Sequence, residues 1–297
     1  MSARRQRRSN DRRCCTDSRS GMPQQSSEAA EAAGRVGMKS IDWTAIARSA
    51  LSLLPDRPAR VVRQGFLNAR GRLFQGDNVS CPCCGGRFSR FLQVGLPSRP
   101  AACPGCDSRE RHRLLHLYLH QQTNLFKDPL RVLHIAPEVS LQSELMKSPN
   151  VSYLSADRSS SLAMTRMDIT DIQFPDASFD VILCSHVLEH VDDDRRAMRE
   201  LHRVLRPGGW AILQVPMDLS RDHTFEDPRV TDPRERTRLF GQWDHVRLYG
   251  RDYAERLRAA GFDLSVERFV SQLRPDFIAT YGLDASEDIY HCRKVQS

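Results

Sequence analysis

The stretch that decides the fold is "DITDIQFPDASFDVILCSHVLEHVDDDRRAMRELHRVLRPGGWAILQVP", residues 168–216. An apolar run ends at Cys184, and a second one follows the glycine pair 208–209. Between them, residues 195–206 place apolar side chains at helical spacing, and Pro207 with the glycines is expected to stop this helix. A strand, a helix and another strand in this order predict a parallel pair of strands joined by a helix.

The same alternation begins at Leu130. "RVLHIA" (131–136) predicts a buried strand, "VSLQSELMKS" (139–148) a helix, and "VSYLSADR" (151–158) a second strand with Asp157 at its carboxyl end. "FDLSVERF" (262–269) and "DIYHCRK" (288–294) predict an antiparallel hairpin that closes the sheet at its edge. The sequence therefore predicts an α/β fold with a mostly parallel sheet flanked by helices, and it shows no internal repeat.

Length and charge narrow the classes of protein. A chain of 297 residues holds one sizeable domain and a smaller module. Most of its net charge of +7 comes from residues 1–20, which contain seven arginines and two aspartates. The remainder is close to neutral, which argues against a broad nucleic-acid-binding face. No apolar stretch approaches the roughly 18 residues that a membrane span requires.

Residues 1–38 are predicted to be a disordered basic tail, because they are rich in Arg, Ser and Gln and poor in apolar residues. Three alternatives stay open: a translation start at Met22 or Met38, a tether to nucleic acid or to a membrane surface, and a targeting peptide. Without a secretory signal the thiols should stay reduced, so we expect a cytoplasmic protein. Residues 39–77 are predicted to be helical, with a break at 56–58 and a second short helix over 59–68.

A cysteine-rich segment, 78–113, predicts a zinc ribbon. Its cysteines form two C-x2-C pairs separated by 18 residues, which is a typical zinc spacing. Two thiolates around a tight turn can share one ion, and two such turns complete a tetrahedron with no open position, so the metal should be structural. Free surface thiols are the alternative, and Cys83 could replace a neighbour. The predicted ligands are Cys81, Cys84, Cys103 and Cys106.

A helix is predicted directly after the ribbon, with Ser108 as its N-cap. His112, His116 and His120 recur along it at four-residue intervals, a spacing that can chelate a metal. No acidic or thiolate partner lies nearby in the sequence. We therefore favour a polar helix face over a second metal site.

Residues 130–297 resemble a known family. The loop "FPDASFD", the motif "HVLEH" after the fourth strand and "LRPGG" before the fifth are similar to class I S-adenosylmethionine-dependent methyltransferases of the type 11 group. The resemblance implies a Rossmann-like sheet of seven strands over 114–297, with the cofactor across the carboxyl ends of the strands. It also implies that Asp157 binds the ribose hydroxyls and that Asp168, beside Ile169, binds the adenine amino group.

The loop after the first strand departs from this family, which usually has glycines and an acidic residue there. This chain has His134, Ala136, Pro137 and Glu138 instead. S-adenosylmethionine carries no phosphate, so a glycine cradle is less necessary than for a dinucleotide. Ala136 is small enough for close approach, and Glu138 is expected to meet the cofactor's amino group or sulfonium. "CPGCDSRERHR" followed by "LHIAPE" resembles a subgroup of the family. This favours a variant form of the cofactor loop over a loop that has decayed.

The acceptor side is harder to read. A long polar segment follows Pro216, and its "QWDHVRLYG" (242–250) places Trp243, His245, Arg247 and Tyr249 where this fold often covers the acceptor. An ordinary capping segment is the alternative. His186 and His245 are candidate general bases, whereas His190 is more readily a packing group. The residues predicted to contact the cofactor are His134, Ala136, Glu138, Asp157, Asp168, Ile169, Cys184 and Ser185.

The sequence thus predicts methyl transfer from S-adenosylmethionine to a small polar or anionic acceptor. Two alternatives belong to other classes. One is a non-catalytic zinc-ribbon binding module with a degenerate cofactor domain. The other is a nucleic-acid methyltransferase that recruits its acceptor through the basic tail.

Overall fold

The structure is a computed structural model, and it describes residues 56–95 and 98–296. These fall in the larger of two compact units, Arg48–Ser297. The predicted basic tail, 1–38, and the start of the predicted helical segment, 39–55, lie outside the described residues.

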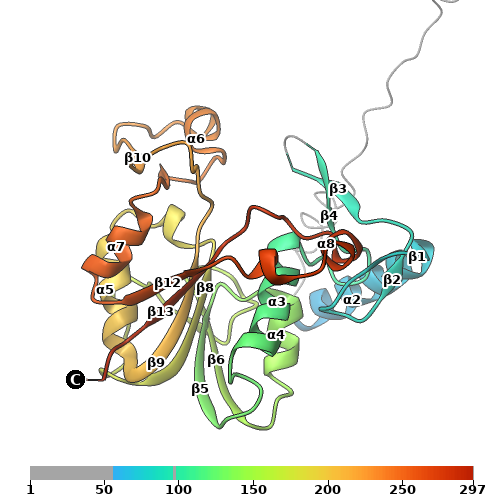
Figure 1. The fold of residues 1–297 in the computed structure, drawn as a ribbon, viewed down its shortest axis with the longest axis horizontal. Coiled ribbons are helices and arrows are strands. Elements are labelled where there is room, and N and C mark those ends of the chain that lie inside the picture. The colour runs from blue at the N-terminus through green and yellow to red at the C-terminus, as the bar shows by residue number, and fades with distance from the viewer. Residues whose placement is uncertain (1–55, 96–97, 297) are drawn as a thin grey trace, which may run out of the picture. The chain divides into compact units, whose positions relative to one another are not determined.

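The centre of the described fold is a seven-stranded sheet in the order β12–β13–β9–β8–β5–β6–β7. The strands from β9 to β7 run parallel, whereas β13 is antiparallel to both of its neighbours. This confirms the predicted fold class, including the closing hairpin (Figure 1). The strands are β5 (Leu130–Ile135), β6 (Val151–Asp157), β7 (Thr165–Arg166), β8 (Phe179–Ser185), β9 (Leu205–Gln214), β12 (Asp263–Glu267) and β13 (Ile289–Arg293).

The chain order reverses between β5 and β8, which are neighbours in the sheet although β6 and β7 come between them in sequence. Both are central strands, and their apolar side chains are buried on both faces. A reversal of this kind leaves a crevice at the carboxyl ends of the strands, because the following loops turn in opposite directions. A ligand site is therefore expected beyond Ile135 and Ser185.

Helices cover both faces of the sheet (Figure 1). On one face lie α3 (Glu110–Gln122) and α4 (Val139–Leu145), and on the other lie α5 (Asp194–Val204) and α7 (Tyr253–Ala259). Each face has its own apolar core. Leu119, Leu145 and Ile212 belong to the first, and Leu133, Leu201 and Leu257 to the second.

The cysteine-rich segment folds as two small hairpins. β1 (Gln75–Ser80) pairs with β2 (Arg87–Phe88), and β3 (Leu92–Val94) pairs with β4 (Arg99–Ala102). They are preceded by α2 (Asp56–Leu73), and their small core contains Phe88 and Phe91 together with buried cysteines. The helix begins at Asp56, before the predicted start at residue 59, because proline is tolerated in a first turn. It also continues to Leu73, past the predicted end at residue 68.

Two predicted helix ends differ in the structure. α3 starts at Glu110 and not after Ser108, since the Ser108 hydroxyl is bonded to ribbon thiols: it lies 3.1 Å from Cys81 Sγ and 3.2 Å from Cys106 Sγ. α5 ends at Val204, before the proline and glycines. The Lys294 ammonium donates to the carbonyls of His202 and Leu205 at 2.9 Å, which satisfies the end of the helix and lets β9 begin at Leu205.

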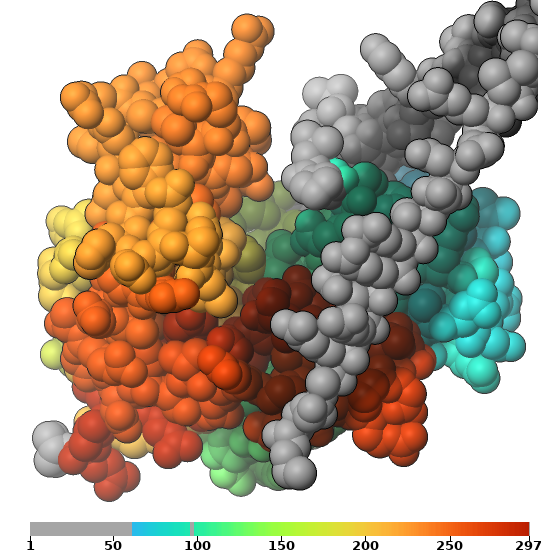
Figure 2. Space-filling view, turned by 45° about the horizontal axis from the view of Figure 1, so that its top comes forward, coloured from blue at the N-terminus to red at the C-terminus, as the bar shows by residue number. Residues whose placement is uncertain are grey.

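The segment between β9 and α7 forms a separate lobe (Figure 2). It contains β10 (Phe225–Glu226), α6 (Pro233–Phe240) and β11 (Arg247–Leu248). Two 3-10 helices, η1 (Leu188–His190) and η2 (Phe269–Gln272), and the helix α8 (Pro275–Tyr281) complete the described elements. Over the residues described, no helix combines the length and the apolarity that a membrane span needs.

Candidate active site

A cavity of about 530 Å³ lies where the reversal of strand order predicts it, beyond the carboxyl ends of β5, β6 and β8. Its walls come from the loops after these strands and from the segment after η1. Four of the eight residues predicted to contact the cofactor line it: Ala136, Asp157, Asp168 and Ile169.

Asp157 and Asp168 both stand in the cavity wall, and each is oriented by its own loop. Asp157 Oδ1 accepts hydrogen bonds from the backbone N–H groups of Ser159 and Ser160, at 2.7 and 2.6 Å. Asp168 Oδ1 accepts from the N–H and the hydroxyl of Thr170, at 2.9 and 2.7 Å, and these bonds lower the pKa of Asp168. Each carboxylate thus has one oxygen committed to its loop, and neither of these bonds uses Oδ2.

Ala136 occupies the position where the sequence lacks the expected glycine, and its φ is +47°. This left-handed conformation is one that glycine adopts without cost and alanine does not. The Ala136 N–H donates to Ala156 O at 2.8 Å, which ties the loop to the end of β6. The backbone therefore follows a glycine-like path without a glycine.

His134 and Glu138 lie beside the cavity but not in its lining. His134 Nε2 donates to Glu138 Oε2 at 2.7 Å, and the Tyr153 hydroxyl lies 3.0 Å from the other ring nitrogen. Burial alone would raise the pKa of Glu138, but the hydrogen bond from His134 lowers it to about 2. The pair fixes the loop between β5 and α4, and their predicted contact with a cofactor stays a prediction.

Cys184 and Ser185 also lie outside the cavity lining, although β8 ends there. Cys184 is 1% exposed, and burial raises the pKa of its thiol, so it packs in the core as a neutral group. The next residue, His186, does line the cavity. Its φ is +57°, again in the left-handed region.

A second cavity of about 320 Å³ adjoins the first at His186, which lines both. The His186 Nε2 atom has no hydrogen-bond partner among the described residues. The walls of the second cavity come from the start of α3, the end of β9 and the segment before β13. Its charged lining residues are Arg99, Glu110, Arg111, Asp284, Glu287 and Asp288.

His245, the second candidate base, lines neither cavity. Its Nδ1 donates to Phe240 O at 3.0 Å, and burial lowers the pKa of the ring. The neighbouring Val246 N–H donates to Glu189 O at 2.9 Å, which joins the lobe to η1. His190 packs against His245 edge to face with ring centroids 4.7 Å apart, and it lines the first cavity.

Arg247 and Tyr249, expected near the acceptor, are buried in a polar network and hold the lobe in place. Arg247 donates to the carbonyls of Leu188, Val191 and Asp192 and to Glu226. The Tyr249 hydroxyl donates to Asp194 at 2.8 Å.

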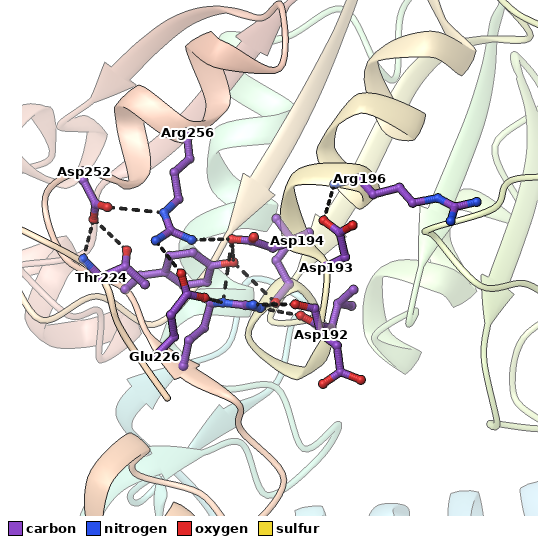
Figure 3. A network of polar contacts seen from close by, with 12 residues as sticks. Asp192, Asp193, Asp194, Arg196, Thr224, Glu226, Asp252 and Arg256 are labelled. Carbon is purple, nitrogen blue, oxygen red and sulfur yellow. Dashed lines mark hydrogen bonds and ion pairs between the residues drawn. The ribbon is translucent and has the colours of Figure 1, made fainter. Parts of the chain in front are cut away.

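Arg256 completes this network by bridging Asp194 and Glu226, at 3.0 and 2.9 Å (Figure 3). Asp252, which also contacts Arg256, accepts from the N–H and the hydroxyl of Thr224. These side chains are therefore occupied by the fold, and they position η1 and the lobe around the first cavity.

The four predicted zinc ligands converge, with all their sulfur atoms within 4.8 Å of one another. Cys81 and Cys106 are 3.6 Å apart at sulfur, and Cys84 and Cys103 are 3.7 Å apart. A tetrahedral ion with Zn–S bonds of about 2.3 Å sets sulfur atoms about 3.8 Å apart, so the arrangement fits zinc. Cys83 lies outside this group, with its thiol directed to His112 O.

Two further clusters escaped the sequence analysis. Glu189, His190 and His245 form one, and His116, His120 and Glu144 form the other. In the second, Glu144 lies 3.2 Å from His116 Nδ1 and 2.8 Å from His120 Nε2. No acidic partner lies nearby in the sequence, but Glu144 reaches these histidines in space because α4 packs beside α3. The sequence shows Glu189 within the spacing H-x2-E-H, but it does not show that this carboxylate is buried.

Residues 140–213 match the model of a family described as "Methyltransferase domain". The match agrees with the predicted class of domain over that span, which runs from α4 almost to the end of β9.

Several known proteins are similar to parts of this chain. The 27-O-demethylrifamycin SV methyltransferase of Amycolatopsis mediterranei is 27% identical over 140 residues, which is 45% of this chain and 47% of that protein. A probable S-adenosylmethionine-dependent methyltransferase of Mycolicibacterium smegmatis is 30% identical over 97 residues, 33% of this chain and 34% of that protein. The chain thus spans half or less of the length of these relatives. The crystal structure of the YcgJ protein from Bacillus subtilis superposes with a TM-score of 0.41 and 17% identity, over 61% of this chain and 100% of that one.

Proposed function

We propose that this protein is an enzyme that transfers a methyl group from S-adenosylmethionine to a small polar acceptor. One observation carries the proposal: the span that matches a methyltransferase domain also supplies most of the lining of the cavity at the strand ends. The cavity volume of about 530 Å³ lies within the range of sites that enclose small ligands.

The lining residues suit the parts of the cofactor. We assign the second oxygen of Asp157 to the ribose hydroxyls and that of Asp168, which Arg158 approaches at 4.0 Å, to the adenine amino group, because carboxylates accept from such donors. Ile169 offers an apolar surface to the base, and the Ala136 backbone allows close approach. His134, Glu138, Cys184 and Ser185 support these loops from outside the lining.

The second cavity is our candidate acceptor site, since it meets the first at His186. Its charged walls carry four carboxylates and two guanidinium groups, and burial raises the pKa of Glu287. This inventory favours a polar or cationic acceptor over the anionic one that Arg247 would have bound.

The reaction needs little covalent help from the protein. A lone pair of the acceptor attacks the methyl carbon, the C–S bond breaks, and its electron pair remains on sulfur as a neutral thioether. Positioning the two reactants in line supplies much of the rate. An acceptor that holds a proton must also lose it, and His186, with an unpartnered Nε2 between the two cavities, is our candidate base.

The zinc ribbon and a cytoplasmic location belong to the same proposal. Four converging thiolates support one structural ion, which would supply cross-linking of the two hairpins and no chemistry at the methyl group. A nucleic-acid acceptor remains the second candidate, and its predicted contact, the basic tail, lies outside the described residues.

Calorimetry of the zinc-loaded full chain with S-adenosylmethionine and S-adenosylhomocysteine tests the proposal. We expect saturable binding in the micromolar range, at least tenfold weaker in Asp157→Asn, which keeps an oxygen for the loop but loses the second carboxylate oxygen. Asp171→Asn is the matched control, because this exposed residue is outside the cavity lining. Folded protein that binds neither ligand would favour the non-catalytic module. Protein that also binds a nucleic acid, and loses this binding at moderate salt, would favour the nucleic-acid methyltransferase.

A further inference from the structure

Glu189, His190 and His245 form a cluster beside the first cavity, in which Glu189 and His245 are buried and His190 is partly exposed. The first two residues lie in η1, and His245 comes from the lobe, between α6 and β11. One nitrogen or oxygen atom from each of the three lies within 4.8 Å of those of the other two. Segments more than 50 residues apart in sequence thus direct two imidazoles and a carboxylate at one place.

Glu189 is the unusual member. It is 1% exposed, and neither of its carboxylate oxygens has a hydrogen-bond partner within the described part of the chain. His186 Nδ1 lies 3.3 Å from Oε1 but does not form a hydrogen bond with it. Burying a carboxylate without compensation is costly, so this position calls for a positive group.

His245 does not supply the positive group that would compensate the Glu189 carboxylate. A carbonyl oxygen only accepts, so the contact with Phe240 O requires the proton on Nδ1 and leaves a lone pair on Nε2. One nitrogen of the His245 ring and a carboxylate oxygen of Glu189 lie within 4.8 Å of each other, and Nε2 is the nitrogen of this ring that is available to a metal ion. A carbonyl that fixes the outer nitrogen of an imidazole is also the usual arrangement around a metal-binding histidine.

We propose that Glu189, His190 and His245 bind a divalent first-row metal ion. Two imidazoles and one carboxylate suit Mn²⁺, Fe²⁺, Co²⁺ or Zn²⁺, and three protein ligands leave positions open for water or a ligand. His190 lines the first cavity, so the ion is reached from there. Asp244 Oδ2, 3.3 Å from His190 Nδ1, holds this ring and adds negative charge.

The other histidine–carboxylate cluster provides a contrast within the same chain. In it, each Glu144 oxygen already has an imidazole within 3.2 Å, and the group is partly exposed. Its charges are therefore satisfied by one another and by solvent. At Glu189 one oxygen has the His186 imidazole at 3.3 Å without a hydrogen bond, and among the described residues the other has no hydrogen-bond partner either. We therefore expect an ion at Glu189 and not at Glu144, which makes Glu144→Gln a matched control.

The chemical use of the ion rests on the proposed function. An acceptor that extends past His186 from the second cavity into the first would present an oxygen to the ion, which would favour loss of the hydroxyl proton. That proton passes to solvent or to His186, the oxygen takes the methyl group, and the electron pair of the broken C–S bond stays on sulfur. The inferred acceptor class is thus a hydroxyl compound, whereas the metal site itself stands without this step.

The test is titration with Mn²⁺ of the full chain loaded with a single equivalent of zinc, which the ribbon thiolates take up, followed by the electron paramagnetic resonance signal of the free ion. Ribbon thiolates prefer zinc, so Mn²⁺ reports a nitrogen–oxygen site. We expect one site per chain, at least tenfold weaker in Glu189→Gln and in His190→Ala, and unchanged in Glu144→Gln. His190 is partly exposed, so its variant should fold even if Glu189→Gln does not.

The outcomes separate the two proposals. Absence of Mn²⁺ binding to the wild type, or equal binding by folded His190→Ala, overturns the metal site. Mn²⁺ binding that depends on His190, in a chain that binds neither S-adenosylmethionine nor its product, keeps the site and removes the proposed function. Cofactor binding without any Mn²⁺ site does the reverse.

Discussion

Two residues at the carboxyl ends of neighbouring strands adopt left-handed backbone conformations without being glycine. Ala136 follows β5 and His186 follows β8, with φ values of +47° and +57°. Such a conformation costs a non-glycine residue about 1 kcal/mol or more, and it persists where the surrounding structure requires it. Both residues line the first cavity, so the strain is located where a ligand would benefit from the resulting loop shape.

Replacement of Ala136 tests this interpretation. Ala136→Gly removes the steric cost of about 1 kcal/mol but adds freedom to the unfolded chain, worth about 0.4–1 kcal/mol, so the free energy of unfolding should stay equal or rise slightly. Ala136→Val should lower it by about 2 kcal/mol and weaken cofactor binding. Urea unfolding measures both. Ala254→Gly, in α7, is the control and should lose about 0.5–1 kcal/mol.

The His134–Glu138 pair predicts a particular acid response. The hydrogen bond from His134 lowers the pKa of Glu138 from an ordinary 4.5 to about 2. Ionised Glu138 therefore stabilises the fold above pH 4.5, and this contribution is lost as the pH falls toward 2. Glu138→Gln should lose about 3 kcal/mol at pH 7, and the difference from wild type should shrink between pH 4.5 and 2. Urea unfolding at several pH values measures it, with exposed Glu255→Gln as control. A difference that stays constant with pH would contradict the assignment.

The sequence predicts the position of a residue where that position follows from local spacing. The four cysteines were predicted to converge because two turns fix their geometry, and they do. Asp157 and Asp168 were predicted at the strand ends because each ends or follows a recognisable strand, and both line the first cavity, whereas their roles stay predictions. Glu189 could not be found in this way. Its burial depends on the lobe residues that pack over it, and no local pattern reports how deep a carboxylate lies or whether a partner reaches it.

At the scale of the elements, one buried arginine joins the ribbon to the rest of the described fold. Arg113, in α3, donates to Ala101 O and Ser108 O on one side, at 2.8 and 2.9 Å. On the other side it donates to Tyr281 O and Gly282 O, at the end of α8, at 2.6 and 2.8 Å. Its guanidinium also stacks over Phe91, 3.9 Å from the ring centroid.

Loss of Arg113 should therefore be severe. Arg113→Ala removes one donor from four buried or partly buried carbonyls, of which Ser108 O keeps the Cys103 N–H, and we expect the free energy of unfolding to fall by about 3 kcal/mol. Arg113→Lys should recover less than half, because an ammonium cannot reproduce the planar fork. Denaturant unfolding measures the loss, and exposed Arg258→Ala should change little. A small effect of Arg113→Ala would mean that the ribbon is held by its apolar contacts alone.

Elements were predictable where a pattern is continuous along the chain, as in the buried runs that became β5, β6 and β8. Their ends were less predictable. The helix α5 stops before Pro207 because Lys294, 89 residues beyond Leu205, binds its last carbonyls. Ser108 is not a cap because distant thiols occupy its hydroxyl. Long-range partners of this kind leave no local signature.

At the scale of the whole described molecule, the ribbon contributes walls as well as stability. Arg99 lies in β4 of the ribbon and pairs with Glu110 at the start of α3, and both line the second cavity with residues from the end of β9. The shape of the candidate acceptor site therefore depends on both the ribbon and the sheet domain, which the sequence analysis predicts as separate domains.

Metal content distinguishes the predicted ligands from their neighbour. Cys103→Ser should lose the zinc and lower the melting temperature, because a structural ion contributes folding free energy directly. Cys83→Ser should keep about one zinc per chain, since its sulfur lies outside the cluster. Atomic emission and thermal unfolding measure both. Equal zinc loss in the two variants would show that Cys83 is a ligand.

The shared wall between ribbon and sheet has a consequence for how such an enzyme would respond to scarcity. If the ribbon binds zinc as proposed, the ion would shape the proposed acceptor cavity without contacting a reactant, whereas no ribbon residue lines the cavity proposed for the methyl donor. A cell short of zinc would then keep molecules that hold the donor but no longer seat the acceptor. As the zinc concentration falls, the rate of methyl transfer would then decrease before the affinity for S-adenosylmethionine does.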